Sequence, residues 1–269
     1  MQMWCTLGAN VRAMMWLLSL VTSSLLMACT QPTSTPTQER TNQTKTEPAI
    51  ARSERKSSAR EETPNKSVEQ ERWLFIGDSL TAGYGLSPDE SYVSVLEARL
   101  SAERWLSEAG HPIKLINAGI SGDTSAGVLR RVDWLLNGDP VRRVFLCIGA
   151  NDGLRGQPVD QLKLNLKNII KRAQAKGAEV TLIGMKIPPN YGARYAQSFE
   201  RVYPEVAAEL KVALLPFLLE GVAGSPKLNL PDGIHPNREG QARVAEHVFS
   251  FLRAQSLIQQ ATPTAQETP

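Results

Sequence analysis

The feature that most constrains the fold is a regular alternation, from Trp73 onward, of short apolar runs and longer amphipathic segments. The runs are rich in aliphatic and β-branched side chains, as is typical of buried strands. They are Trp73–Ile76, Ile113–Asn117, Val141–Ile148, Glu179–Gly184 and Val212–Pro216. The helix-like segments lie near residues 91–107, 125–137, 159–176, 196–210 and 238–254. This alternation predicts an α/β protein with one five-stranded parallel sheet and helices on both of its faces.

Chemically suggestive residues follow several of these predicted strands. The clusters are Gly77-Asp78-Ser79-Leu80, the segment 117–124, the segment 149–153 and the segment 232–237. Each cluster alone is also ordinary turn or helix-cap chemistry. The active sites of open α/β sheets lie outside the carboxyl ends of the strands. Four such clusters at strand ends therefore predict one site at that edge of the sheet.

Three residues of these clusters have the chemistry of nucleophilic acyl transfer. A serine hydroxyl needs an imidazole to take its proton, and an acid must orient the imidazole and stabilise its charged form. Asp232 and His235 are three residues apart in one loop, and Ser79 follows the first predicted strand. His111 and His247 are the competing histidines, and neither has an acid and a serine nearby in a suggestive pattern, so we expect structural roles for both.

The same clusters contain donors for an oxyanion. These are the backbone N–H of Ser79, that of Gly122 and the side-chain amide of Asn151. A glycine at position 122 lets the backbone approach a substrate closely. On the residues alone the alternative stays open that Asp232-Gly233 is a simple turn and that Asn151 only caps a helix.

The four clusters resemble the four conserved blocks of the GDSL, or SGNH, hydrolase family, and they occur in the family's order. The segments 117–125, 151–156, 189–192 and 232–237 are similar to the bacterial thioesterase I, lysophospholipase L1 and arylesterase branch. The resemblance covers about residues 72–254. It implies a flavodoxin-like three-layer α/β/α sandwich without a cofactor or a catalytic metal ion. It also implies Ser79 as nucleophile, His235 as base and acid, Asp232 as its orienting carboxylate, and Ser79, Gly122 and Asn151 as the oxyanion hole.

Two departures from the branch concern the acyl site. Ala150 stands where a glycine is common, and the segment after Gly156 is about one residue shorter, so the preferred chain length is open. We expect the apolar wall of that site to come from four residues. These are Leu154, Ile187, Pro188 and Tyr191. No Gly-x-Ser-x-Gly sequence is present, which disfavours the α/β-hydrolase fold.

The N-terminal residues have the pattern of an export signal. Arg12 precedes an apolar stretch, 13–28, that is too short to span a membrane comfortably. The stretch ends in Leu26-Met27-Ala28-Cys29, which resembles the lipobox of bacterial lipoproteins, although Met27 departs from it. We therefore expect residues 1–28 to be a lipoprotein signal peptide and Cys29 to carry the lipid. A plain signal peptide is the alternative.

The expected domains follow from composition. Residues 29–71 are rich in Thr, Pro, Ser and mixed charge, which predicts a disordered tether with a mean reach of roughly 35–40 Å. Residues 72–257 form the hydrolase domain, and 258–269 a disordered tail. Anchored in this way, the enzyme would lie on the periplasmic side of the cell envelope, and Thr30 after Cys29 favours the outer membrane if there is one.

The charge balance and the family resemblance together narrow the partners. Thirty basic and 27 acidic residues give a net charge of +3, and without a basic stretch a nucleic-acid partner is not expected. Three histidines argue against a metal hydrolase. We expect a monomer whose substrate is a small acyl ester or a lysophospholipid and which meets the membrane through Cys29. The alternatives are a polysaccharide acetylesterase on the same scaffold and a non-catalytic surface-binding lipoprotein.

Overall fold

The structure of the protein is a computed structural model that describes residues 70–261. The expected signal peptide, Cys29 and all of the expected tether before Gln70 lie outside the described residues. The last eight residues of the expected tail, 262–269, lie outside them as well.

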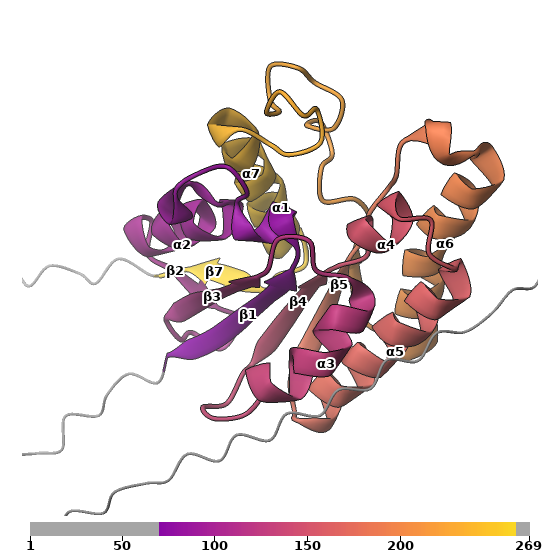
Figure 1. The fold of residues 1–269 in the computed structure, drawn as a ribbon. Coiled ribbons are helices and arrows are strands. Elements are labelled where there is room, and N and C mark those ends of the chain that lie inside the picture. Colours follow the sequence, from indigo (N-terminus) through magenta and orange to yellow (C-terminus); the bar gives the residue numbers. More distant parts are fainter. Residues whose placement is uncertain (1–69, 262–269) are drawn as a thin grey trace, which may run out of the picture. The chain divides into compact units, whose positions relative to one another are not determined.

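The centre of the described part is one parallel sheet of five strands, as the sequence predicts (Figure 1). Across the sheet the strands are β3 (Ile113–Gly119), β1 (Glu71–Gly77), β4 (Arg143–Cys147), β5 (Glu179–Ile183) and β6 (Ala213–Leu215). Counted along the chain within this sheet, the order is 2-1-3-4-5, which is the flavodoxin-like order. Its topological switch point lies between β1 and β4, because the chain leaves β1 in one direction and returns to its other side.

Helices cover both faces of the sheet and complete the predicted three layers (Figure 1). On one face α2 (Tyr92–Ala102) packs against α7 (Arg238–Ala254). On the other, α5 (Val159–Ala175) packs between α3 (Ser125–Leu135) and α6 (Ala193–Leu210). The shorter elements are the helices α1 (Ser79–Ala82) and α4 (Ala150–Leu154) and the 3₁₀ turns η1 (Pro88–Glu90) and η2 (Pro189–Tyr191). No helix within residues 70–261 is long and apolar enough to cross a membrane.

The core lies on both sides of the central strands. β1 and β4 are buried on both faces, as expected for a parallel sheet that helices cover twice. Phe75 and Phe145, which are paired in register, stack with ring centroids 4.4 Å apart. The ring of Trp73 also packs on Phe145, with the ring centroids 5.7 Å apart. These rings hold β1 and β4 together beneath the switch point, so the ends of the two strands are fixed relative to each other.

A second, two-stranded antiparallel sheet corrects the sequence prediction at two places. The helix predicted over 91–107 ends at Ala102, and β2 (Trp105–Ser107) follows it. β2 pairs with β7 (Ile258–Gln260), so the first part of the predicted tail belongs to the domain. Arg104 takes a positive φ of 56° between the helix and β2, which reverses the chain there.

Candidate active site

Ser79 lies directly after β1, as the first residue of the short helix α1. The reversal from strand to helix is tight because Gly77 has no side chain: a Cβ there would lie 2.0 Å from Oγ1 of Thr81. Oδ1 of Asp78 caps α1 by accepting a hydrogen bond of 3.0 Å from the N–H of Leu80. Among residues 70–261, no hydrogen bond uses the N–H of Ser79. The hydroxyl and the N–H of Ser79 are therefore both available at the carboxyl edge of the sheet.

The structure brings Ser79, His235 and Asp232 into one chain of hydrogen bonds. Nε2 of His235 lies 2.8 Å from Oγ of Ser79, and Nδ1 of His235 lies 2.8 Å from Oδ2 of Asp232. His235 and Asp232 come from the long loop between β6 and α7, which crosses above the sheet to reach α1 (Figure 1). This geometry allows the imidazole to take a proton from the serine while the carboxylate holds its other nitrogen.

The carboxylate of Asp232 is held as an anion. Oδ1 accepts hydrogen bonds of 3.0 Å from the N–H groups of Ile234 and His235, which leaves Oδ2 for the imidazole. Partial burial raises the pKa of Asp232, but these two N–H groups and the imidazole outweigh it, and the pKa lies below its usual range. Tyr84 covers one face of the imidazole, with the ring centroids 4.5 Å apart.

Gly122 lies in a turn that exposes its backbone to the site. The N–H of Asp123 donates to the carbonyl of Ile120 at 3.0 Å, and Gly122 takes φ +79° at the third position, as in type II turns. A side chain is disfavoured at such a φ, which gives the physical reason for glycine here. The guanidinium of Arg155 binds the carbonyl of Gly122 at 3.0 Å. Among the described residues, no hydrogen bond uses the N–H of Gly122.

Asn151 is the third expected donor, and it lies in α4, just beyond the end of β4. Its Nδ2 donates to the carbonyl of Asp123 at 3.0 Å, which uses one of the two amide hydrogens. The second hydrogen remains for a ligand. Because β1 and β4 flank the switch point, Ser79 and Asn151 meet across it, in the place where such sheets bind their ligands.

One cavity of about 660 Å³ connects the expected oxyanion hole with the serine and the histidine. Ser79, Gly122, Asn151 and His235 line it together. Its walls are mainly apolar side chains, and they include three of the four residues expected there. The apolar wall consists of Leu154, Ile187, Pro188, Met185, Phe217 and Leu219.

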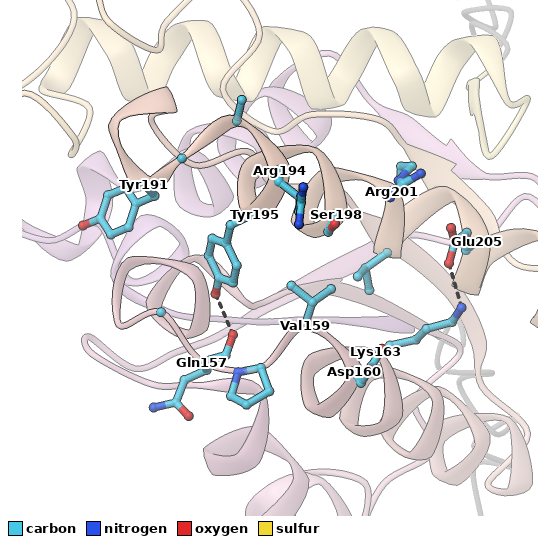
Figure 2. A pocket seen from close by; sticks show the side chains of 15 residues that line it. Gln157, Val159, Asp160, Lys163, Tyr191, Arg194, Tyr195, Ser198, Arg201 and Glu205 are labelled. Carbon is cyan, nitrogen blue, oxygen red and sulfur yellow. Dashed lines mark hydrogen bonds and ion pairs between the residues drawn. The ribbon is translucent and has the colours of Figure 1, made fainter. Parts of the chain in front are cut away.

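Tyr191, which we expected in the apolar wall of the acyl site, does not line this cavity. It lines a neighbouring pocket between the start of α5 and the start of α6, with Tyr195 and Arg194. Figure 2 shows this second pocket, in which the hydroxyl of Tyr195 donates to the carbonyl of Gln157 at 2.6 Å. The 3₁₀ turn η2 follows Pro188 and redirects the chain, so residues three apart in sequence face different pockets.

The hydrogen bonds between several buried polar residues around the site had no recognisable sequence signal. Asp152, beside Asn151, accepts from the N–H of Ser125 at 2.9 Å and from its hydroxyl at 2.5 Å. Asn165 of α5 donates to the same hydroxyl at 2.9 Å. These contacts join α4 and α5 to the start of α3, although the residues are 27 and 40 positions apart. Only the fold brings such side chains together, so no local pattern could have identified these contacts.

Asp78 is the most unusual ionisable residue near the site. It is 1% exposed, and its Oδ2 has no hydrogen-bond partner among the described residues. Burial, together with the nearby carboxylates of Asp123 and Asp152, raises the pKa of Asp78 to about 7. The hydrogen bond from Leu80 lowers this pKa but does not outweigh the effect of burial. A carboxyl group that protonates near neutral pH therefore lies beside the serine in the chain.

The geometry is that of an α/β protein with a serine-hydrolase site at its switch point, and comparisons with known proteins agree. The GDSL-like lipase/acylhydrolase family model matches residues 75–243. Esterase TesA of Pseudomonas aeruginosa is 44% identical over 180 residues, which are 67% of this chain and 87% of that protein. Thioesterase 1/protease 1/lysophospholipase L1 of Escherichia coli K12 is 39% identical over 180 residues, 67% of this chain and 82% of that protein.

A solved structure extends the likeness to three dimensions. The esterase EstA from Pseudoalteromonas, in a structure inhibited by monoethylphosphonate, matches with a TM-score of 0.64 and 36% identity over 68% of this chain and 97% of that one. The chain belongs to the GDSL-like lipase/acylhydrolase family. It is a carboxylic ester hydrolase with the SGNH hydrolase fold, as the four motif blocks predict.

Proposed function

We propose that Ser79 is the nucleophile of this hydrolase, that His235 is its general base and acid, and that Asp232 orients the imidazole. The observation that carries this proposal is the continuous chain of two 2.8 Å contacts from Oγ of Ser79 through His235 to Asp232. Such contacts let a serine of ordinary acidity lose its proton at the moment of attack.

The reaction then has two halves. Ser79 Oγ attacks the ester carbonyl while its proton moves to Nε2 of His235, and the oxyanion accepts hydrogen bonds from the N–H groups of Ser79 and Gly122 and from Nδ2 of Asn151. When the tetrahedral intermediate collapses, His235 gives the proton to the departing alkoxide or thiolate. Water then attacks the acyl-serine with His235 again as base, and Ser79 regains its proton when the acid leaves.

The substrate that fits best is an ester with a medium or long acyl chain. Leu154, Ile187 and Pro188 line the same cavity as Ser79, and its volume of about 660 Å³ is of the size that small-molecule sites commonly have. The similarity to a protein named thioesterase 1/protease 1/lysophospholipase L1 supports lysophospholipids and thioesters as candidate substrates. A polysaccharide acetylesterase would not need an apolar wall of this extent.

We further propose that the enzyme acts as a monomer held to the cell envelope through lipid on Cys29. The support is the apolar stretch that ends at Cys29 and the polar composition of residues 29–71. Labelling of the expressed full chain with a clickable palmitate, compared with Cys29→Ser, tests the anchor. The account requires label and membrane association in the first and neither in the second. Equal labelling of both would refute it.

The experiment for the catalytic proposal uses residues 30–269 and p-nitrophenyl esters from acetyl to palmitoyl. We expect hydrolysis that favours chains longer than acetyl and that is lost in Ser79→Ala, with metal chelators having no effect. A strong preference for acetyl over octanoyl would favour the polysaccharide acetylesterase. Unchanged hydrolysis in Ser79→Ala would refute the proposed nucleophile, and no Ser79-dependent activity on any ester would favour a surface-binding lipoprotein.

A further inference from the structure

Asp123 is joined to two of the three parts of the proposed oxyanion hole, the turn at Gly122 and the side chain of Asn151. Its N–H closes the turn that presents Gly122, and its carbonyl accepts the 3.0 Å hydrogen bond from Nδ2 of Asn151. Its carboxylate binds the guanidinium of Arg131, with Oδ2 2.8 Å from Nε. The position of this one residue therefore sets where Gly122 and Asn151 lie.

Arg131 continues the connection to the nucleophile. It lies in α3, and its second terminal nitrogen donates to the carbonyl of Gly77 at 3.2 Å. Gly77 is the last residue of β1, two positions before Ser79, and its carbonyl also accepts from the N–H of Ile120 at 3.1 Å. One guanidinium thus contacts both the loop of the oxyanion hole and the strand end that carries the serine.

The Asp123–Arg131 pair is more buried than the other ion pair that α3 makes. The side chains of Arg131 and Asp123 are 17% and 11% exposed, whereas those of Arg172 of α5 and Asp133 of α3 are 44% and 58% exposed. Exposed pairs contribute little to stability, and partly buried ones hold a defined geometry because water competes less for their hydrogen bonds.

The carboxylate of Asp123 also depends on a glycine beneath it. A Cβ at Gly127 would lie 1.7 Å from Oδ1 of Asp123. Gly127 lies in the first turn of α3, where alanine would favour the helix by about 1 kcal/mol. The absence of a side chain therefore leaves room for the carboxylate, at the expense of helix propensity.

We propose that the Arg131–Asp123 ion pair positions the oxyanion hole against the nucleophile, so that Arg131 and Gly127 set the rate of the chemical step without touching substrate. The inference rests on the catalytic roles proposed for Ser79, Gly122 and Asn151. Without Arg131 the carboxylate of Asp123 loses its contact with the end of β1, and the turn at Gly122 is held there by the backbone hydrogen bond from Ile120 to Gly77. Small displacements of groups that stabilise a transition state lower kcat more than substrate binding.

The test compares Arg131→Met, Arg131→Lys and Gly127→Ala with the neighbouring exposed Arg130→Met as control. Steady-state kinetics on p-nitrophenyl octanoate give kcat and KM, inactivation by a p-nitrophenyl alkylphosphonate reports the tetrahedral state, and thermal unfolding reports stability. We expect Arg131→Met to lower kcat and the rate of phosphonate inactivation by about tenfold or more, with KM within about twofold of the wild-type value. Arg131→Lys should fall between Arg131→Met and the wild type. Arg130→Met should match the wild type.

Gly127→Ala keeps the proposal testable even if Arg131→Met unfolds. The added methyl displaces the side chain of Asp123 rather than backbone, so we expect the variant to stay folded with a lowered kcat. Full kcat in a folded Arg131→Met or Gly127→Ala would overturn the proposal, and so would a raised KM at unchanged kcat. Activity that survives in the Ser79→Ala variant would instead refute the proposed catalytic mechanism. The failure of this inference and the failure of the proposed mechanism are therefore distinguishable.

Discussion

The buried carboxyl of Asp78 leads to a prediction about stability and pH. Asp78→Asn keeps an oxygen to cap α1 at Leu80 and removes the ionisable group. Burial raises the pKa of Asp78 to about 7 from its ordinary value of 3.8. A carboxyl whose pKa is raised on folding favours the folded state while it is protonated. This contribution to stability is present in full below pH 3.8 and is lost as the pH rises to about 7.

The magnitude follows from the shift itself. A change of about three pKa units, at about 1.4 kcal/mol per unit, is about 4 kcal/mol, and it is felt in full above pH 7. The free energy of unfolding of Asp78→Asn minus that of the wild type should therefore rise by about 3 kcal/mol between pH 4.5 and pH 8. Urea unfolding at both pH values measures this difference. A difference that is the same at both would show that Asp78 is ionised throughout and would refute the argument.

Three further substitutions test the site. Asn151→Ala should lower kcat by roughly 10²–10³ with little change in KM, and a rate within tenfold of the wild type would remove it from the oxyanion hole. Leu154→Trp should fill the cavity and lower the octanoyl-to-butyryl ratio of kcat/KM by about tenfold, whereas an unchanged ratio would place the acyl chain elsewhere. Gly77→Ala should cost about 1–3 kcal/mol in urea unfolding, because its Cβ would lie 2.0 Å from Thr81 Oγ1 and 2.9 Å from the carbonyl of Cys147; a wild-type stability would contradict this packing.

The sequence predicted those parts of the molecule whose signal is local. The three central strands β1, β4 and β5 are runs of mostly buried residues, and the residues that follow β1, β3 and β4 carry the motif blocks directly. Because a parallel sheet brings the carboxyl ends of its strands to one edge, placing Ser79, Gly122 and Asn151 near each other required only the order of the elements.

The features that the sequence did not reveal depend on partners far along the chain. β2 and β7 are three residues each and pair across about 150 positions, so neither has a periodicity that distinguishes it from a helix end or a tail. Tyr191 lines a different pocket from Leu154, Ile187 and Pro188 because the turn η2 changes which pocket the loop faces. The contact of Arg131 with Gly77 spans 54 positions and uses a backbone carbonyl, which leaves no trace in the sequence.

The central claim is that Ser79 forms the covalent bond to the acyl group, and an active-site phosphonate tests it most directly. A p-nitrophenyl alkylphosphonate should release one equivalent of nitrophenol per protein, abolish ester hydrolysis and leave its phosphonyl group on Ser79 in a peptide map. His235→Ala should slow this labelling by orders of magnitude, because the imidazole at 2.8 Å no longer takes the serine proton. An adduct on another residue, or full hydrolysis after complete labelling of Ser79, would contradict the account.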